Sequence, residues 1–457
     1  MNSDRLSKPA FFALAGLWVI IVYYTIVPWL LHVTLTSNSP IDLSGLTWVF
    51  VSLSLTGTAM WFFMQVAYLF VKNRSIQEHA AMIRDKRYTQ LPLVSIIIPA
   101  RNEEAVIKRT IASCLAQTFG NLEVIVVCHN CSDGTFQQAQ SQDPRVFPYD
   151  FRTDEAGKGL ALNFGVSKAK GEYILVLDSD GIMNPDFTTN ALPYFDKGFA
   201  AVQGKIVASN REYNRNTKLL ALEGDLYSTP FMTVRSLIEK RAPLGGTGLV
   251  ISRDALMRAG GFKNALIDDF ELSFRFFRFG ERIAFAPLCI VYDEKPPKLD
   301  LIIRQRSRWV KGHFDLLKEK VPESRDLFGN IYWLNPIFML AGLASLAVMS
   351  TAILSYIFLG QMPFKFSFLP IVAWIVLTLS SMALQIFLLT KELGIRGLRY
   401  AGYVALLAVY SNYWYVSLVK SFFVKSWATT KTSHGFVSEK DLQSIIVDKT
   451  GSEKEAA

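Results

Sequence analysis

Charged residues are nearly absent from two long stretches of this 457-residue chain. No Lys or Arg lies between Lys8 and Lys72, where the only acid is Asp42, and Lys365 is the only charge in residues 331–390. A helix needs about 20 apolar residues to cross a hydrocarbon core of about 30 Å. The expected spans are residues 9–35, 46–71, 331–359 and 366–389, with a fifth at 400–424. The lack of charge therefore excludes a wholly soluble chain and predicts an integral, multi-pass membrane protein.

Lys and Arg are also missing from the loop at residues 37–45, which predicts how the chain is oriented. Arg5 and Lys8 precede the first span, and a basic group follows the second: Lys72, Arg74, Arg84, Lys86 and Arg87. We expect a protein of the cell (plasma or inner) membrane with its central block in the cytoplasm. An odd number of C-terminal spans would put the basic segment 425–431 outside, against this rule. The number of those spans and the side of the C-terminus stay open.

The first apolar run is too long for the core of a cleaved signal peptide, which has 7–15 residues. It also contains Pro28 and is followed at once by a second span. We therefore expect a retained anchor at residues 9–35.

Cysteine is scarce, and its pattern argues against a zinc site. The chain has four cysteines, with Cys128 and Cys131 forming a lone Cys-x-x-Cys. A structural zinc ion usually takes four ligands, so without a second pair we expect buried thiols. The net charge is +9, but basic residues beside membrane spans usually face anionic lipid. We therefore expect this basic surface to contact the lipid bilayer, and we expect no nucleic acid partner.

Strand and helix signals alternate in the block between the apolar stretches. Aliphatic runs predict strands at residues 93–98, 122–127, 146–149 and 173–177, and helical spacing predicts helices at 105–117 and 159–169. This rhythm predicts an α/β domain with a parallel sheet. The expected organisation is two membrane helices (1–72), a cytoplasmic domain (73–297), an amphipathic interfacial segment (298–330), further membrane helices (331–427) and a polar tail (428–457).

A pair of carboxylates, Asp178 and Asp180, follows the predicted strand at 173–177. Side chains alternate along an extended chain, so both should point to one side. Oxygen ligands of this kind suit Mg²⁺ or Mn²⁺ shared with substrate phosphates. A solvated turn is the alternative, but ligands of such sheets bind at the carboxyl ends of strands. Residues 101–104 and 129–133 should lie at the same edge.

A second acidic pair, Asp268 and Asp269, opens a predicted helix. One of the two could cap that helix, which leaves the other available as a general base for an acceptor hydroxyl. The preceding loop at residues 245–248, Gly-Gly-Thr-Gly, could approach a sugar closely or be a plain bend.

A third motif, Gln305-x-x-Arg308-Trp309, lies on a basic amphipathic stretch that starts at residue 299. Arg308 could neutralise a leaving diphosphate, and Trp309 offers a flat apolar face to a sugar ring. The alternative is an interfacial helix with Arg facing head groups and Trp at the lipid boundary, and both readings can hold together. Lys158, beside two glycines, could contact phosphate.

These motifs, in this order and at this spacing, resemble the membrane-embedded family 2 glycosyltransferases. That family includes the synthases of cellulose, hyaluronan, chitin oligosaccharides and poly-N-acetylglucosamine. The resemblance covers roughly residues 92–312 and implies a Rossmann-like GT-A fold, a UDP-sugar donor, a divalent metal (Mg²⁺ or Mn²⁺) and inversion at the anomeric carbon.

The resemblance also implies roles for individual residues. Asp269 matches the catalytic base, and Asp268 stands where relatives commonly have Glu. Asp178 and Asp180 match the metal pair, and the implied acceptor and diphosphate contacts are Gln305, Arg308 and Trp309. The implied donor-binding residues are Ala100, Glu103, His129, Asp133, Lys158, Asp178 and Asp180.

One departure from the family concerns the nucleotide base. Relatives usually carry an Asp where Cys128 and His129 stand. Neutral His129 could accept a hydrogen bond from uracil, or Asp133 takes that role, or the donor nucleotide differs.

The sequence thus predicts a processive synthase that extends a β-linked polysaccharide from UDP-N-acetylglucosamine or UDP-glucose and moves it across the membrane. The alternative is an enzyme that transfers one sugar to a membrane lipid. A transporter is disfavoured because the spans carry almost no ionisable residues. The acceptor is therefore a glycan or a lipid, and the sugar, the linkage, the oligomeric state and any accessory subunit stay open.

Overall fold

A computed structural model describes residues 41–85, 91–318, 334–359, 364, 369–393, 398–425 and 434–435. The chain divides into two compact units. One comprises Met1–Phe70 and Arg325–Leu418, and the other comprises Val71–Ser324 and Val419–Ala457. The predicted span at residues 9–35 and all of the predicted tail except residues 434–435 lie outside the described residues.

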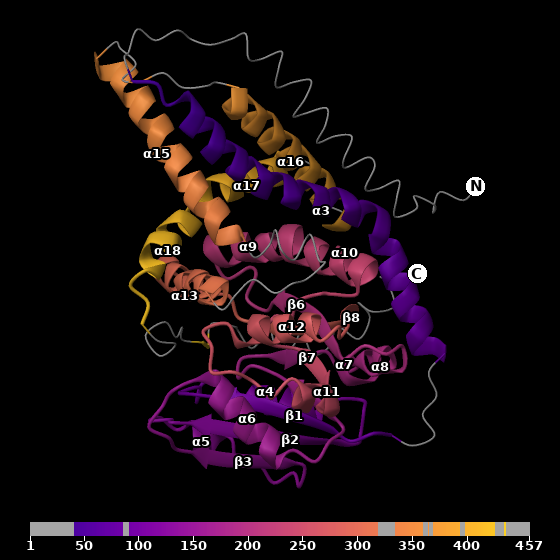
Figure 1. The fold of residues 1–457 in the computed structure, drawn as a ribbon. Helices are drawn as coiled ribbons and strands as arrows, with labels where there is room; N and C mark the ends of the chain where they lie inside the picture. Colours follow the sequence, from indigo (N-terminus) through magenta and orange to yellow (C-terminus); the bar gives the residue numbers. More distant parts are fainter. Residues whose placement is uncertain are drawn as a thin grey trace, which may run out of the picture. The chain divides into compact units, whose positions relative to one another are not determined.

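An eight-stranded sheet organises the second unit (Figure 1), in the order β3-β2-β1-β4-β7-β6-β8-β5. Its first four strands lie where the sequence predicts them: β1 (Val94–Ala100), β2 (Leu122–His129), β3 (Val146–Phe151) and β4 (Tyr173–Val176). The others are β5 (Ile182–Met183), β6 (Ala201–Ala208), β7 (Leu249–Ser252) and β8 (Ile283–Asp293).

The direction of the strands confirms only part of the sequence expectation. β3, β2, β1 and β4 pair in parallel. However, β7 runs antiparallel to both β4 and β6, and β5 runs antiparallel to β8. β6 and β8 pair in parallel, so the sheet is mixed and the expectation of a parallel sheet is wrong for β7 and β5. A short apolar run such as β7 carries no signal of its direction, which the path of the preceding connection decides.

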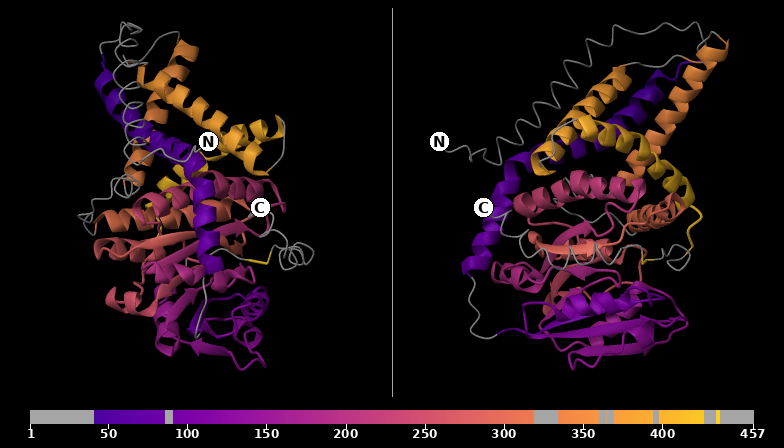
Figure 2. Two further views of the ribbon diagram at one scale, coloured as in Figure 1. Left: turned by 90° about the vertical axis from the view of Figure 1, so that its right-hand side faces the viewer. Right: turned by 180° about the vertical axis from the view of Figure 1, so that it is seen from behind.

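Helices cover both faces of this sheet (Figure 2). One core joins the sheet to α4 (Ile107–Leu115), α7 (Phe187–Ala191) and α8 (Pro193–Asp196). The other core joins it to α6 (Lys158–Lys168), α11 (Arg253–Arg258) and α12 (Asp268–Arg278). Side chains alternate along β1, so Ile96 and Ile98 enter the first core and Ile97 the second. Burial on both faces explains the uninterrupted aliphatic sequence of β1.

Apart from the ends of α3 and α18, this unit has five further helical elements among its described residues. They are α5 (Thr135–Gln138), α9 (Arg215–Glu223), a π-helical turn η2 (Gly224–Ser228), α10 (Thr229–Glu239) and α13 (Leu299–Lys318). Helix α13 carries the Gln-x-x-Arg-Trp motif, within the stretch predicted to be amphipathic.

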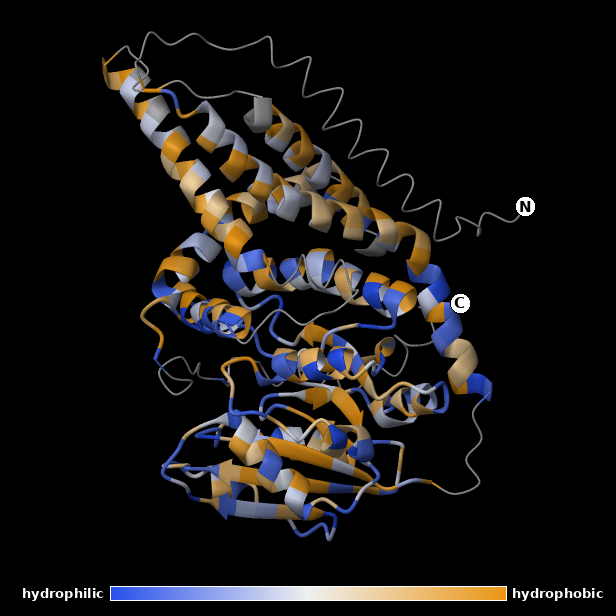
Figure 3. Ribbon diagram, viewed as in Figure 1, coloured by the Kyte–Doolittle hydropathy of each residue, from blue (hydrophilic) through white to orange (hydrophobic). Residues whose placement is uncertain are grey.

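The described residues of the first unit are mainly helical. This unit contains the first part of α3 (Ser44–Asp85), with α15 (Asn335–Leu359), α16 (Leu369–Leu393), α17 (Leu398–Tyr410) and most of α18 (Tyr413–Ser421). Apolar residues dominate α15 and α16, and the end of α3 is hydrophilic (Figure 3). Among the described residues, Ser44–Asp85 and Val372–Lys391 are long and apolar enough to cross a membrane, by length and composition.

The predicted span at residues 400–424 does not form one helix. The chain turns at Ser411 and Asn412, which separate α17 from α18. Both side chains bond back to helix carbonyls, Ser411 to Leu407 and Asn412 to Val409. The resulting helices have 13 and 9 residues, fewer than the roughly 20 that a crossing needs. The expectation of one continuous helix here is therefore wrong, and a membrane crossing by these residues stays a prediction.

Candidate active site

The first acidic pair lies in a tight turn just beyond β4. The Gly181 N–H donates to the carbonyl of Asp178 at 2.9 Å, so the chain bends instead of continuing extended. The expectation that both carboxylates point to one side of an extended chain is wrong. A Cβ at Gly181 would lie 2.6 Å from the side chain of Leu177, which explains why a glycine ends the turn. Asp178 and Asp180 consequently have different partners.

Lys158 connects the two acidic pairs of the sequence. It is the first residue of α6, and its Nζ lies 2.6 Å from Asp178 Oδ1 and 2.9 Å from the carbonyl oxygen of Gly246. Burial opposes the charged form of Lys158, but the carboxylates of Asp178, Asp268 and Asp269 outweigh it and raise the pKa of Lys158. One ammonium group therefore lies among carboxylates from the end of β4 and from the start of α12.

The second acidic pair opens α12, but neither residue caps it. Ile267 occupies the N-cap position without a side-chain hydrogen bond. The capping expectation is wrong because the helix begins at Asp268 itself, so both carboxylates lie in the first turn. Burial raises the pKa of Asp268. Burial, followed by the charge of Asp268, raises the pKa of Asp269 to about 6, a value that suits a general base near neutral pH.

The glycine loop at residues 245–248 packs directly against Asp269. Gly246 has φ +81°, and a Cβ there would lie 2.9 Å from Asp269 Oδ2. The hydroxyl of Thr247 accepts a hydrogen bond from the Asp178 N–H at 3.0 Å. The loop therefore contacts both acidic segments and is more than a bend between α10 and β7.

The motif on α13 contributes one residue to the same neighbourhood. Arg308 donates from Nη1 to the carbonyl oxygen of Leu266 at 2.6 Å, which ties α13 to the segment just before α12. Burial lowers the pKa of Arg308, partly offset by the charges of Asp268 and Asp269. In this structure Arg308 thus holds in place the segment that leads into Asp268 and Asp269.

Trp309 and Gln305 are arranged by Arg306, a residue that the sequence analysis did not single out. The guanidinium of Arg306 lies over the indole of Trp309, 3.9 Å from the ring centroid. Its Nη2 is 3.7 Å from Glu223 at the end of α9, and its Nη1 donates to Gln305 at 3.2 Å. The sequence did offer one signal for Arg306, which is a basic residue inside the Gln-x-x-Arg-Trp motif.

The side chains of the predicted base-binding residues already have partners, some of them in neighbouring segments. His129 Nε2 lies 2.7 Å from the Thr153 hydroxyl, and burial lowers the pKa of His129. Asp133 accepts from the N–H and hydroxyl of Thr135 and from the N–H of Glu104. Those bonds outweigh burial and lower the pKa of Asp133. Ala100 is the buried last residue of β1.

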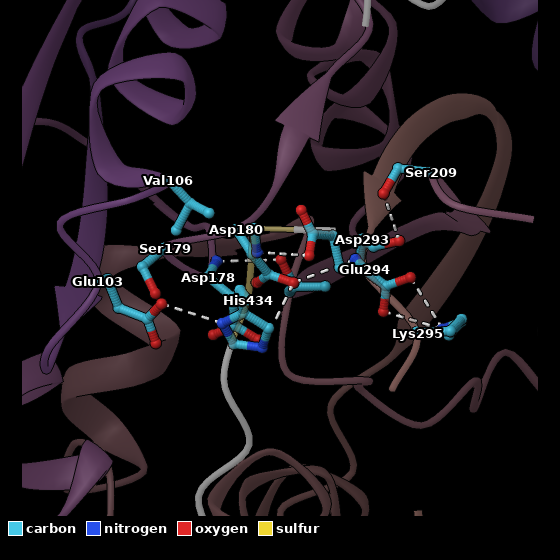
Figure 4. Close-up of polar contacts among 12 residues, drawn as sticks. Glu103, Val106, Asp178, Ser179, Asp180, Ser209, Asp293, Glu294, Lys295 and His434 are labelled. Atoms are coloured by element: carbon cyan, nitrogen blue, oxygen red, sulfur yellow. Dashed lines mark hydrogen bonds and ion pairs between the residues drawn. The ribbon is translucent and has the colours of Figure 1, made fainter. Parts of the chain in front are cut away.

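A second cluster gathers around Asp180 (Figure 4). Asp180 Oδ2 accepts from the Glu294 N–H at 3.1 Å. His434 places Nδ1 3.0 Å from Glu103 Oε2 and Nε2 3.8 Å from Asp180 Oδ2. Burial raises the pKa of Asp180 to about 6. Burial opposes the charged form of His434, but Asp180 and Glu103 outweigh it and raise the pKa of His434 to about 10.

The structure thus brings most of the predicted residues to one edge of the sheet. Asp178, Asp268 and Asp269 surround Lys158, and Asp180 and Glu103 both lie near the ring of His434. The sequence analysis missed Glu294 and His434. Glu294 directly follows β8, so its position after a strand was a usable signal, whereas nothing in the C-terminal segment pointed to His434.

A sequence model described as "Glycosyltransferase like family 2" matches residues 92–312. Residues 92–312 are a family 2 glycosyltransferase domain. The matched segment contains both acidic pairs and the Gln-x-x-Arg-Trp motif. The expectations of an enzyme and of this family are thereby confirmed.

Curated relatives of this glycosyltransferase fall into more than one class. A probable glycosyltransferase of Bacillus subtilis, YdaM, is 27% identical over 83% of this chain and 94% of its own length. A poly-beta-1,6-N-acetyl-D-glucosamine synthase of Staphylococcus epidermidis is 22% identical over 67% of this chain and 76% of its own. A beta-monoglucosyldiacylglycerol synthase of Trichormus variabilis is 29% identical over 49% of each chain.

A solved structure supports the GT-A fold of the glycosyltransferase domain. The mannosyltransferase PcManGT of Pyrobaculum calidifontis, in complex with GDP-Man and Mn²⁺, matches with a TM-score of 0.52 and 19% identity. The match covers 82% of this chain and 99% of that one. At this identity the likeness establishes the fold alone.

The residues of the glycosyltransferase domain fit a divalent cation by their chemistry. Among the described residues, no group of three or more His, Cys, Asp or Glu side chains has the spacing of a preformed metal site. Mg²⁺ and Mn²⁺ sites for phosphate substrates often use only one or two carboxylates and complete their shell with phosphate oxygens. Asp178 and Asp180 suit such a shared site. All four cysteines are free and buried, as expected.

The glycosyltransferase unit also has a cavity of about 510 Å³, which contains none of the predicted site residues. It lies beside the end of α3, α8 and the end of α10, and its lining includes Glu78, Tyr194, Lys240 and Arg282. Opposite charges are mixed in this lining, and we assign the cavity no part in catalysis.

Proposed function

We propose that this chain is a membrane-bound, inverting glycosyltransferase that moves a hexosyl group from a nucleotide-sugar to an acceptor hydroxyl. One observation carries this proposal: Lys158 lies among Asp178, Asp268 and Asp269. Asp178, which is suited to bind the donor's cation, and Asp269, which is suited to take the acceptor's proton, therefore lie near the same ammonium group. Transfer between two substrates requires this proximity.

The proposed reaction assigns Asp269 as the base. Asp269 takes the proton of the acceptor hydroxyl while the acceptor oxygen bonds to the anomeric carbon of the sugar. The bond from that carbon to the diphosphate breaks, and the nucleoside diphosphate leaves with the electron pair. Lys158 is placed to hold the donor phosphates through charge-assisted hydrogen bonds. A divalent cation, when bound with Asp178 and Asp180, offsets negative charge on the leaving diphosphate.

We propose a UDP-sugar as the donor, on the resemblance to polysaccharide synthases. The side chain of His129 already contacts Thr153, and that of Asp133 already bonds to Thr135 and the Glu104 N–H. The segments that carry His129 and Asp133 would therefore contact the base through other groups. The solved neighbour with GDP-Man makes the guanosine nucleotides the necessary comparison. Donor choice is therefore tested with UDP- and GDP-sugars side by side.

We propose a growing β-linked polysaccharide as the acceptor, extended repeatedly and moved across the membrane. The poly-N-acetylglucosamine synthase relative supports this acceptor over 67% of the chain. Trp309, with Arg306 over one face of its ring, suits contact with a sugar. The second candidate is a single transfer to a membrane lipid, which the diacylglycerol-linked relative supports at 29% identity over about half of the chain.

We propose that the helical unit is embedded in the membrane and that the glycosyltransferase domain is cytoplasmic. Exposed apolar side chains on α15 and α16, such as Ile357, Phe358 and Leu379, support this proposal because such surface is costly in water. The proposed organisation is membrane helices at 1–72 and 331–427, the enzyme at 73–297, an interfacial segment at 298–330 and a polar tail at 428–457. Arg and Lys beside the second span support the cytoplasmic side.

Product analysis tests these proposals together. Membranes that contain the protein are incubated with labelled UDP-N-acetylglucosamine, UDP-glucose and GDP-mannose in separate reactions. We expect a labelled polymer from a UDP-sugar, sized by gel filtration after lipid extraction. A labelled lipid that carries a single sugar would instead support the second candidate, transfer of one sugar to a membrane lipid. No transfer from any of the nucleotide-sugars, with the protein folded, would overturn the enzymatic proposal.

A further inference from the structure

Helix α13 packs against the start of α12 at a position that leaves no room for a side chain. Gly312 is buried, and a Cβ there would lie 2.7, 2.9 and 3.1 Å from Cγ1, Cγ2 and Cδ1 of Ile267. Carbon atoms in contact are normally about 3.5–4.0 Å apart. Gly312 follows Arg308 by one helical turn, so the two share a face of α13, and Arg308 bonds to the carbonyl oxygen of Leu266. One face of α13 therefore contacts the two residues directly before α12.

The first turn of α12 starts from Ile267. This residue is buried, with 5% of its surface exposed, and its backbone is not helical, with φ −135° and ψ 70°. Its carbonyl oxygen accepts a hydrogen bond from the Glu271 N–H at 3.0 Å. A displacement of Ile267 would therefore move the turn that carries Asp268 and Asp269.

The carboxylate of Asp269 is oriented by the same turn. Its Oδ1 accepts a hydrogen bond from the Phe270 N–H at 2.7 Å. The ring of Phe270 in turn lies against the ring of His313 on α13, with 5.0 Å between the centroids. The other oxygen, Oδ2, lies close to the backbone of Gly246. Asp269 is thus confined by the glycine loop and by a helical turn that α13 supports.

The contact at Gly312 is close enough for a small change to affect catalysis. A methyl group at this position requires Ile267 to move by about 1 Å before ordinary carbon contacts are restored. Close packing around a buried side chain leaves little space for another adjustment. Misplacing a reacting group by 1 Å can lower a rate by about 10²-fold.

We propose that Gly312 and Ile267 are positioning residues, and that their contact sets where Asp269 lies relative to the acceptor hydroxyl. This inference rests on the proposed function, because the role of Asp269 as general base is itself proposed. Trp309, the proposed platform for the acceptor sugar, precedes Gly312 by three residues on α13. The same helix therefore places the acceptor and supports the group that takes its proton.

Gly312→Ala tests the inference in the full-length protein in detergent, with the labelled nucleotide-sugar that supports transfer. We expect kcat to fall about 10- to 100-fold. The donor KM should stay constant, and so should the affinity for the matching nucleoside diphosphate in titration calorimetry. Gly402→Ala is the matched control. Gly402 also lies inside a helix, α17, but a Cβ there meets nothing within 4 Å, so its kcat should equal that of the wild type.

A double-mutant cycle with Asp269→Asn separates positioning from general damage to the fold. If Gly312 acts through the base, its substitution has little left to remove once the base is absent. We therefore expect Gly312→Ala to change the rate by no more than about twofold in the Asp269→Asn protein. A methyl group that merely loosens the structure would lower the rate by the same factor in both proteins. Melting temperatures establish that each variant is folded.

Substitutions of Ile267 test the contact from its other side. Ile267→Ala removes all three atoms that the new methyl group meets, so adding it to Gly312→Ala should restore part of the lost kcat. Ile267→Val deletes one methyl group and creates no clash. It gives a second cycle with Asp269→Asn should Gly312→Ala fail to fold, and its smaller loss of kcat should likewise disappear when the base is absent.

Several results would overturn the inference. They are an unchanged kcat in Gly312→Ala, equal losses with and without the carboxylate of Asp269, no recovery on adding Ile267→Ala, and a donor KM that rises as much as kcat falls. The rate of Asp269→Asn alone distinguishes the two levels of failure. If that variant keeps the wild-type rate, the proposed base fails. If it loses the rate and the losses in the cycle are equal, only the positioning inference fails.

Discussion

Replacing Asp269 by Asn should abolish most of the transfer activity while making the protein more stable. The pKa of Asp269 is raised from 3.8 to about 6, so the native state binds this proton more tightly than the unfolded state does. A difference of about 2 pKa units corresponds to roughly 3 kcal/mol at pH 7. An amide of the same shape removes this cost.

The expected gain in stability is smaller than that full value. Lys158 and Arg308 both lose a nearby negative charge in the variant, so we expect a gain of about 1–3 kcal/mol at pH 7. For a folded acid with a raised pKa, stability falls as the pH rises from about 4 to about 6. The variant should therefore exceed the wild type in melting temperature above pH 6, and the two should converge below pH 4.

Transfer by the wild type should also fall as the pH drops through about 6, because the base becomes protonated. In Asp269→Asn the rate should fall about 10²- to 10⁴-fold, the usual contribution of a general base. Initial rates with a labelled nucleotide-sugar and melting curves between pH 4 and 8 measure both effects. Asp254→Asn is the control, since the Asp254 side chain is 83% exposed and is not one of the site residues. Wild-type rates in Asp269→Asn would refute the base, and a lower melting temperature at pH 7 would refute the electrostatic argument.

Two further substitutions test the loop and the aromatic platform. Gly246→Ala should lower transfer more than tenfold, because the new methyl group meets Asp269 2.9 Å away. Gly280→Ala, at a similar φ of +74° with open space around it, should cost stability alone, and equal rates in the two variants would contradict the clash. Arg306→Lys removes the planar group over Trp309, so the acceptor KM should rise while the donor KM stays constant in two-substrate kinetics. A rise in both constants would show that Arg306 supports the whole site.

Periodicity and motif spacing were sufficient to predict the first half of the glycosyltransferase domain. The aliphatic runs of β1 and β2 are buried on both faces, and that environment leaves a plain mark in sequence. The position of Asp178 after β4 was equally readable, since ligands gather where parallel strands end. Helix α12 was also predicted to begin at the second acidic pair.

Local geometry was less readable than location. The bend at Asp178 depends on Gly181 packing against Leu177, and the missing cap of α12 depends on where its first hydrogen bond forms. The direction of β7 depends on the path of the chain between β6 and β7. Each of these features is decided by contacts that a single sequence does not contain.

The amino-acid sequence alone determined the class of chemistry, because carboxylates, a lysine and an Arg-Trp pair must be encoded as residue types at workable spacing. It also indicated which segments are apolar enough to cross a membrane, by length and composition. Only the tertiary structure decided which of these groups meet. Lys158 joins two acidic segments more than eighty residues apart, and His434 reaches Asp180 from the far end of the chain. Such encounters depend on long-range folding, which places side chains by packing and not by their order in the sequence.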